Sequence, residues 1–530
     1  MKTASEKKNV SRAAGVVGFY TLISRILGLL RDMVLARFFG TGMVADAFFV
    51  AFRIPNLLRR LFAEGSLTIA FIPVFTEYLT NRSRKEALEL ARIVLTLLSL
   101  ILSGITVLGI LLSPWIVRIQ AFGFGGTGVK YDLTVLLTRI TFPYIFFIGI
   151  VAFFMGVLNS LRRFAAPAAA PIFLNAGIVG SAYVISPHLS EPIVGVALGV
   201  LIGGGLQVLL QIPWVVKEGL PFTPLWQPRH RGIRKIGLLM LPAIFGSAVY
   251  QLNQFMGTLL ASFLREGSVS WLYYADRLVQ FPLGVFAIAL STAALPSLSS
   301  QAAKGEMGAL FDTLSHALRM VFFITLPSMA GLLCLGEPII RVFFEGGPFD
   351  AFSTHMTHLG LMAYTGGLWA FSGTRMMVSA FYALQDTKTP VKVAVVALVL
   401  NGGLSLLLMG PLHHAGLALA LSLASSIQFC LLIYLFVKKI GIGDLKPIGQ
   451  TVLRCMAASI VMGVGVHVLH RHWFQVNMSG GSFGMCMELG ILVGMGGLFY
   501  FATAALFRCA EISSILDLVK DRLQRVKHPS

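Results

Sequence analysis

The chain has 530 residues, of which 56% are hydrophobic and 12% are charged, and its mean hydropathy is +0.80. Because soluble globular domains carry roughly 25% charged residues, this composition excludes an ordinary soluble domain and indicates a polytopic membrane protein. The net charge of +19 does not indicate a nucleic-acid partner, because the basic residues punctuate apolar segments instead of forming one patch.

A membrane-spanning helix needs about 20 mostly apolar residues. By this criterion the predicted fold is an all-α polytopic membrane protein with fourteen spanning segments. The segments cover residues 14–37, 44–78, 88–116, 132–157, 168–186, 192–216, 237–264, 271–299, 309–334, 355–383, 390–410, 414–437, 449–469 and 483–507. About 26 of the 42 Lys and Arg residues lie in every second connection and at the termini, so the positive-inside rule places both termini in the cytoplasm.

Short motifs recur at nearly constant spacing along the chain. The first half contains AFRIP, AFIPVF and FLNAG, and the second half contains LVQFP, AALPSL and VLNGG. The matched residues are Pro55 and Pro282, Pro73 and Pro296, and Asn175 and Asn401, which are 227, 223 and 226 positions apart. We therefore predict two copies of a six-helix unit, related by a pseudo-two-fold axis along the membrane normal.

This duplication predicts the domain organisation. The N-terminal lobe is expected at residues 1–218, the C-terminal lobe at 219–440, and an unduplicated helix pair at 441–510. Residues 511–530 form a basic cytoplasmic tail with a helical pattern. A further stretch, residues 337–350, is short and amphipathic and ends in Gly and Pro; we expect it to depart from a simple span and to lie in the outer membrane interface.

Residues 24–64 place many charged side chains inside otherwise apolar sequence. A charge within a spanning helix costs a few kcal/mol, so such residues normally face a protein interior or a watery cavity. Six arginines against three carboxylates leave an excess of positive charge, which suits an anionic ligand such as a diphosphate. The charged residues are Arg25, Arg31, Asp32, Arg37, Asp46, Arg53, Arg59, Arg60 and Glu64.

The spacing of these charges predicts one polar stripe on the second segment. Asp46, Arg53 and Arg60 are seven residues apart, close to two helical turns, so their side chains share one side of the helix. The alternative is a set of buried ion pairs that only fix helix packing. On the first segment, Asp32 lies seven residues after Arg25 and is expected to restrain Arg25 or Arg31 when no ligand is bound.

Intramembrane charge is sparser in the second half. Arg277, in WLYYADRLVQFP, is expected to face the same cavity and contact the substrate, or else to extend from the helix end toward the interface. Arg139 and Arg375 stand alone, and we expect local partners for both.

The sequence does not favour an enzyme or a metal protein. We find no paired carboxylates on a membrane-facing loop and no nucleophile with a neighbouring base. The histidine groups lie at predicted outer ends without a carboxylate or cysteine set, so neither a metal nor a cofactor is expected. The five cysteines lie in or beside hydrophobic segments and are expected to be inert thiols. The polar leader at residues 1–12 is not followed by a convincing signal-peptide cleavage site.

Five motifs along the chain are SRILGLLRDMVLARFFG, DAFFVAFRIPNLLRRLFAEG, AFIPVF, YYADRL and FYALQDTKTP. Together they closely resemble the MurJ (MviN) family of bacterial lipid II flippases, within the multidrug/oligosaccharidyl-lipid/polysaccharide exporter superfamily. The resemblance implies two lobes around a central cavity, alternating access across the inner membrane, and a lipid-tail groove formed by helices thirteen and fourteen. The implied partners are lipid II (undecaprenyl-diphosphate disaccharide pentapeptide), membrane lipids and the cell-wall synthesis machinery. Carried over residue by residue, the family's functional charges fall on Arg25, Arg31, Asp32, Asp46, Arg59, Arg60 and Arg277.

The sequence leaves more than one hypothesis for the driving force of transport and for the cargo. Sodium coupling is not expected, because segments seven and eleven have no acidic residue and Asn401 alone would make a weak site. We expect the membrane potential to drive transport, since one charge crossing 100 mV is worth about 2.3 kcal/mol.

The second choice of function is a flippase for another polyprenyl-diphosphate glycan, such as an O-antigen or teichoic-acid unit. A multidrug cation antiporter fits less well, because a cation site needs membrane-embedded carboxylates.

Overall fold

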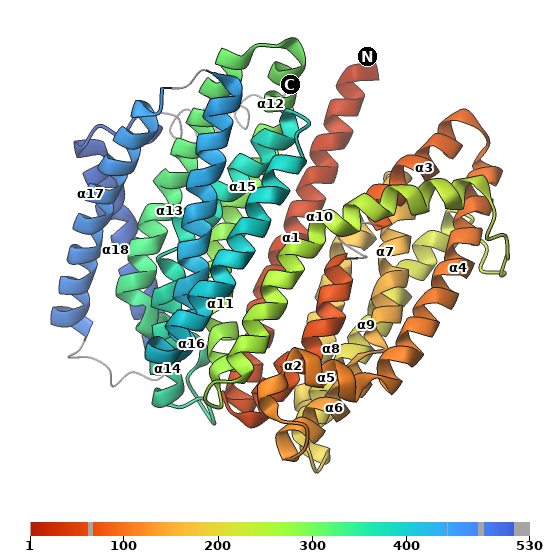
Figure 1. Cartoon of the computed structure of the whole chain (residues 1–530), viewed down its shortest axis with the longest axis horizontal. Coiled ribbons are helices and arrows are strands. Elements are labelled where there is room, and N and C mark those ends of the chain that lie inside the picture. Colours follow the sequence, from red (N-terminus) through yellow and green to blue (C-terminus); the bar gives the residue numbers. More distant parts are fainter. Residues whose placement is uncertain (1, 62–66, 442–443, 475–481, 513–530) are drawn as a thin grey trace. The chain divides into compact units, whose positions relative to one another are not determined.

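The structure is a computed structural model that describes residues 2–61, 67–441, 444–474 and 482–512. Every regular element in these ranges is a helix (Figure 1), which confirms the predicted all-α fold. Within them, nine helical stretches are long and apolar enough to cross a membrane. The predicted tail at 511–530 lies outside the described residues, apart from its first two positions.

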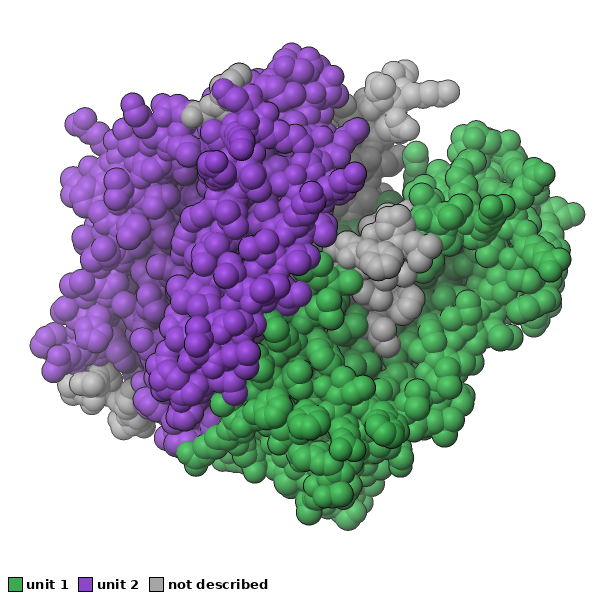
Figure 2. Space-filling view, viewed as in Figure 1, with its two compact units in different colours: residues 1–270, 346–350 green, residues 271–345, 351–530 purple. Residues whose placement is uncertain are grey.

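The chain packs into two compact units, coloured separately in Figure 2. Unit 1 comprises residues 1–270 and 346–350, and unit 2 comprises residues 271–345 and 351–530. Unit 1 contains α1 (Lys2–Phe39), α2 (Met43–Leu61), α3 (Leu67–Asn81), α4 (Arg84–Leu111), α5 (Ser113–Gln120), η2 (Phe122–Phe124), α6 (Val129–Thr141), α7 (Tyr144–Ser160), α8 (Ala165–Val184), η3 (Ser186–His188), α9 (Pro192–Lys217) and α10 (Arg231–Ser262).

Helix α11 (Ser268–Pro282) begins in unit 1 and continues into unit 2. The rest of unit 2 comprises the π-helical segment η4 (Leu283–Ala287), α12 (Ile288–Lys304), α13 (Met307–Phe344), α14 (Ala351–Thr365), α15 (Leu368–Ala383), α16 (Lys388–Ile440), α17 (Lys446–Leu469), the π-helical segment η5 (His470–Phe474) and α18 (Ser482–Leu506).

Several predicted spanning segments correspond to divided or joined helices. The predicted segment 132–157 is divided into α6 and α7 at Pro143, which has no backbone N–H to continue the helical bonding. Helix α16 contains two predicted segments and has one non-helical residue between them, His413, with φ 50° and ψ −131°. The number of fourteen crossings therefore stays a prediction.

The sequence predicted that residues 337–350 depart from the span before them, and the structure contradicts this for residues 337–344. Helix α13 runs without a break to Phe344, and only the residues after it form a turn. The last turns of α13 carry Arg341, which pairs with Glu337 at 3.3 Å and with Glu345 at 3.4 Å. Because side chains four residues apart lie on the same side of a helix, these pairs favour continuing the helix through Pro338.

Helix bounds recur between the two halves of the chain. Helix α4 begins at Arg84 and α13 begins at Met307, an offset equal to the one between the repeated prolines of AFIPVF and AALPSL. Arg162 before α8 and Gln385 before α16 are separated by the same offset, and both have left-handed backbone angles, with φ of 61° and 57°. These matched positions support the internal duplication. The lobes at 1–218 and 219–440 are defined by the repeat, not by packing, and remain predictions.

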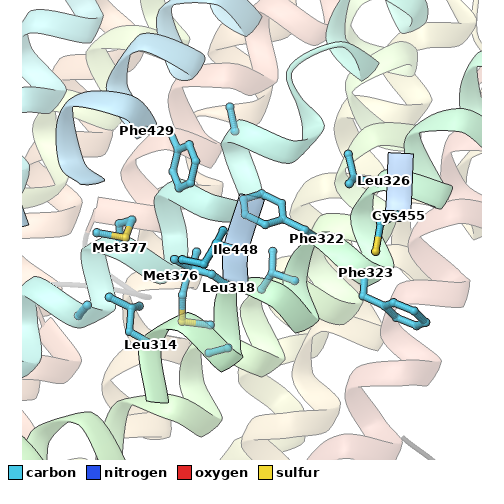
Figure 3. Close-up of a cluster of buried hydrophobic side chains, with 14 of the residues drawn as sticks. Leu314, Leu318, Phe322, Phe323, Leu326, Met376, Met377, Phe429, Ile448 and Cys455 are labelled. Carbon is cyan, nitrogen blue, oxygen red and sulfur yellow. The ribbon is translucent and has the colours of Figure 1, made fainter. Parts of the chain in front are cut away.

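Unit 2 has a hydrophobic core to which α17 and α18 also contribute. Figure 3 shows part of it, in which α13 contributes Phe322, α15 contributes Met376, α16 contributes Phe429 and α17 contributes Cys455. Tyr500 of α18 also donates a 2.7 Å hydrogen bond to the Phe323 carbonyl of α13. The helix pair outside the duplication is therefore packed firmly against the rest of unit 2.

Unit 1 includes a close crossing of α8 and α9. A methyl group added to Gly177 of α8 would lie 2.6 Å from the Cα of Gly203 of α9, closer than real side chains approach. Small residues of this kind let two membrane helices approach closely. The crossing fixes the position of α8, which also packs against α1.

Candidate functional site

The charged stretch on α1 forms an ion pair at Arg31. Its Nε and Nη2 both donate to Asp32 Oδ1, at 3.0 and 2.7 Å. Asp32 is 2% exposed, and a carboxylate this deeply buried needs a paired and hydrogen-bonded partner to offset its lost hydration. The expected restraint of Arg31 by Asp32 is therefore present in the structure.

A second helix also contacts Arg31. Asn175 of α8 accepts a hydrogen bond from Arg31 Nη1 at 3.1 Å through Oδ1, and its Nδ2 donates to the Ser24 carbonyl of α1 at 3.2 Å. Sequence reasoning used Asn175 only as a repeat marker and missed this contact. The available signal was an amide within an apolar helix, since polar side chains at membrane depth normally pair with one another.

Asp46 is surrounded by donors within unit 1. Its Oδ2 accepts from Lys130 Nζ and from the Gly267 backbone N–H, both at 2.9 Å. Its Oδ1 accepts from the Ser270 N–H at 2.9 Å and from Ser270 Oγ at 2.6 Å. With 1% of its surface exposed, Asp46 joins the N-terminal ends of α2, α6 and α11. A carboxylate near a helix N-terminus also interacts favourably with the helix dipole.

The remaining charges on α2 have different partners. Arg53 Nη2 donates to the Gln254 backbone carbonyl at 2.9 Å and to its side-chain oxygen at 3.2 Å, which connects α2 to α10. Arg59 Nε donates to Asn56 Oδ1 one turn earlier, at 3.0 Å. Arg60 lies on α2, but its side chain and all of Glu64 are outside the described residues.

Arg25 and Arg277, the other two arginines predicted to bind the substrate, differ in their surroundings. Arg25 is on the exposed side of α1. Arg277 belongs to α11 in unit 2, where its guanidinium lies 4.6 Å from the centre of the Tyr273 ring and its Nη2 donates to Tyr273 Oη at 3.0 Å. A cation over an aromatic face is attracted by the ring quadrupole, so Tyr273 orients this arginine.

The two solitary arginines of the sequence differ. Arg139 has the expected local partner, because its Nε donates to Ser113 Oγ at 3.1 Å. Arg375 is exposed on α15. In the part of the chain that the structure describes, no three His, Cys, Asp or Glu side chains form a set able to hold a metal ion.

Four arginines lie on the first two helices of unit 1. Helix α1 carries Arg25 and Arg31, of which Arg31 pairs with Asp32, and α2 carries Arg53 and Arg59. A guanidinium has five N–H donors and stays protonated, so it can bind phosphate oxygens in a partly dry environment. The arrangement contains groups for holding a ligand and orienting it.

Known proteins resemble this chain along most of its length. A family model described as lipid II flippase MurJ matches residues 35–487. A probable lipid II flippase MurJ of Vibrio cholerae is 39% identical over 432 residues, covering 80% of this chain and 82% of the relative. The lipid II flippase MurJ of Burkholderia cenocepacia is 36% identical over 475 residues, covering 88% of this chain and 91% of the relative.

Solved structures show the same fold. The lipid II flippase MurJ in an inward closed conformation aligns with a TM-score of 0.78 and 27% identity, covering 94% of this chain and 99% of that structure. An inward-facing multidrug resistance transporter of the MATE family aligns with a TM-score of 0.70 over 81% of this chain and 98% of that structure. At 14% identity, the second likeness shows the fold alone.

These matches and the long apolar helices make the protein a multi-pass bacterial membrane transporter and not a catalytic enzyme. Because the family model covers most of the chain and the two relatives are 39% and 36% identical over most of their length, the chain belongs to the MurJ family of lipid II flippases.

Proposed function

We propose that this protein moves lipid II from the cytoplasmic to the periplasmic leaflet of the inner membrane, for peptidoglycan synthesis. The observation that carries the proposal is the family match over residues 35–487, together with relatives that are named lipid II flippases. No covalent step is needed, because the cargo leaves chemically unchanged. The transporter only has to bind it on one side and release it on the other.

The diphosphate of the cargo is the group that the arginines would hold. Each guanidinium can donate two parallel hydrogen bonds to phosphate oxygens, and such charge-assisted bonds are roughly twice as strong as neutral ones. Six arginines, on α1, α2 and α11, are proposed to share this role in different steps. They are Arg25, Arg31, Arg53, Arg59, Arg60 and Arg277.

The acidic members of the predicted site would act differently. A carboxylate repels a diphosphate, so Asp32 and Asp46 contribute by holding cations and helix ends in position. Asp32 would keep Arg31 oriented while the site is empty. Glu64 is proposed as a further counter-charge near the end of α2.

Transport would proceed by alternating access between two repeat-related lobes, at residues 1–218 and 219–440. The helix pair at 441–510 is proposed to hold the polyprenyl tail, since α17 exposes large aliphatic side chains such as Leu453 and Ile460. The membrane potential acting on the charged site is the proposed driver. Both termini are proposed to lie in the cytoplasm.

The proposal is tested by complementation of a bacterial strain depleted of its own lipid II flippase. We expect rescue by the wild type and no rescue by Arg31→Ala or Arg60→Ala at matched membrane levels. Because Arg31→Ala leaves the buried Asp32 carboxylate without its ion-pair partner, some loss of stability is expected, and the membrane level of each variant is therefore measured. Arg82→Ala serves as the matched control, because Arg82 and its ion-pair partner Glu86 are both exposed and the variant should rescue fully.

Three other results of the complementation experiment would each change the proposal. Failure of the well-expressed wild type would redirect the cargo to another polyprenyl-diphosphate glycan, such as an O-antigen or teichoic-acid unit. Rescue by every variant would keep the cargo but remove the arginines from its mechanism. Loss of Arg31→Ala and Arg60→Ala from the membrane would favour a structural ion-pair role instead.

A further inference from the structure

We propose that Asn175 is a positioning residue that holds the Arg31 guanidinium ready for the diphosphate of the cargo. The inference rests on the proposed function and extends it to a residue of α8 outside the charged stretch. It starts from one juxtaposition within unit 1, in which the Asn175 amide lies between Arg31 and the backbone of α1.

Both ends of the Asn175 amide are used. Its oxygen accepts from Arg31 Nη1 at 3.1 Å, and its nitrogen donates to the Ser24 carbonyl at 3.2 Å. Flipping the amide would turn its NH₂ group toward another donor and its oxygen toward another acceptor, so the partners determine one orientation. At 6% exposure the side chain has little access to water as a substitute partner.

Arg31 is thereby held from two helices. Asp32, on the same helix, accepts hydrogen bonds from Nε and Nη2 of the guanidinium. Asn175, on α8, accepts one from Nη1. Because the guanidinium is planar and rigid, contacts at three nitrogens fix its plane. An arginine ordered before the ligand arrives loses less conformational entropy on binding, which raises affinity.

An amide suits this role better than a carboxylate. The charge of Arg31 already faces one carboxylate, that of Asp32. A second carboxylate at position 175 would cancel the positive charge that attracts the diphosphate, whereas a neutral amide orients the arginine without competing for its charge.

The backbone around Asn175 is well placed to hold it. Gly28 of α1 faces the amide, and a methyl group there would lie 3.8 Å from Asn175 Nδ2, so no side chain separates the two helices at this point. Two residues further along α8, the close approach of Gly177 to Gly203 holds α8 against α9. The amide therefore lies where α8 meets α1, and α8 is itself packed against α9.

The test measures binding of undecaprenyl diphosphate and of uncharged undecaprenol to the purified full-length protein, by native mass spectrometry. Asn175→Leu removes both hydrogen bonds, and Asn175→Asp keeps the shape but adds a charge. We expect each variant to bind the diphosphate about tenfold more weakly than wild type, since charge-assisted hydrogen bonds carry roughly that factor. Binding of undecaprenol should not change.

A pH series separates the two variants. The deficit of Asn175→Asp should shrink as the pH falls and the new carboxylate becomes protonated, while the deficit of Asn175→Leu should stay constant. The matched control is Gln207→Leu, because Gln207 is another buried amide, on α9, whose Nε2 donates to the Ala170 carbonyl at 3.0 Å. It should bind the diphosphate as wild type does.

Three results would overturn the inference while leaving the proposed function in place. Wild-type affinity in both Asn175 variants would remove the positioning role. Equal weakening for undecaprenol, or in Gln207→Leu, would mean that buried amides here only support the fold. If Asn175→Leu does not fold, the isosteric Asn175→Asp and its pH dependence decide the question. Failure of the wild type itself to bind the diphosphate would instead refute the proposed function, and the inference with it.

Discussion

Asp46 shows how the surroundings of a charged residue decide its role. Its spacing from Arg53 puts it on the polar stripe of α2, yet its carboxylate is almost fully buried and accepts four hydrogen bonds. Three of these come from the first turn of α11 and the glycine before it. A group with this many donors has little capacity left for a ligand, so we assign it to positioning helix ends.

This assignment predicts a loss of stability. Asp46→Ala would leave Lys130 and two backbone N–H groups without their partner, and removing one member of a buried ion pair costs about 3 kcal/mol. The thermal midpoint of the detergent-purified protein should fall clearly. Adding Lys130→Met should recover part of the loss, because the unpaired cation is then removed. An unchanged midpoint in Asp46→Ala would contradict the positioning role.

At the scale of elements, Glu218 connects three helices of unit 1. It accepts from Arg84 Nη2 at 2.9 Å and from Arg163 Nε at 2.8 Å, joining the end of α9 to the start of α4 and to the α7–α8 connection. The hydrogen bond from Arg163, followed by that from Arg84, holds the pKa of Glu218 below its usual range despite partial burial.

The second repeat makes the same connection with the charges reversed. Asp386 occupies the position in the second repeat that Arg163 occupies in the first, and it accepts from Lys439 near the end of α16 at 2.5 Å. Burial alone would raise the pKa of Asp386, but the bonds from Lys439 and Thr389 outweigh it and lower the pKa. In each repeat an ion pair thus joins the connection between two helices to a later helix end: Arg163 pairs with Glu218 in the first repeat, and Asp386 pairs with Lys439 in the second.

These pKa shifts predict how stability depends on pH. Because the pKa of Glu218 is lower in the folded than in the unfolded protein, its contribution is complete above the unfolded pKa of about 4.3 and is lost as the pH falls through the folded pKa. Glu218→Gln should lower the free energy of unfolding by about 1 kcal/mol at pH 7, since both arginines are largely exposed.

Thermal melts at pH 7 and pH 3.5 check this expectation. The gap between wild type and Glu218→Gln should be present at pH 7 and narrow at pH 3.5. A gap of equal size at both values would mean that the carboxylate charge does not stabilise the connection. Glu89→Gln is a suitable control, because Glu89 is an exposed residue of α4.

For the whole molecule, the repeat and the distribution of basic residues together predict the orientation in the membrane. An even number of helices per repeat gives both copies the same direction, and basic connections recur on one side. The α7–α8 and α15–α16 connections should therefore both face the cytoplasm, and the α5–α6 connection should face the periplasm.

Reporter fusions test this orientation. A green fluorescent protein fused after Ser530 should fluoresce, because it matures in the cytoplasm, and alkaline phosphatase at the same position should be inactive. Alkaline phosphatase inserted at Gly126, in the α5–α6 connection, should be active. The reverse pattern would overturn the predicted orientation, including the direction proposed for transport.

The sequence by itself determined the features that depend on local composition and spacing. Long apolar segments predicted the all-α membrane fold, and the recurring motifs predicted the duplication that the helix bounds support. The sequence also predicted Arg25 or Arg31 as the partner of Asp32, and the structure pairs Asp32 with Arg31. The family could also be identified from contiguous motifs. None of these requires knowing which distant segments meet.

Only the tertiary structure decided which groups the charged residues contact. Asn175 lies 144 residues from Arg31, and Gly267 lies 221 residues from Asp46, so neither contact has a local signal. The continuation of α13 to Phe344 was missed because Pro and Gly suggest a helix end, whereas the ion pairs of Arg341 support the helix once it has formed. The physical reason for the two distant contacts is that a buried charge needs a partner, and packing chooses that partner from the whole chain.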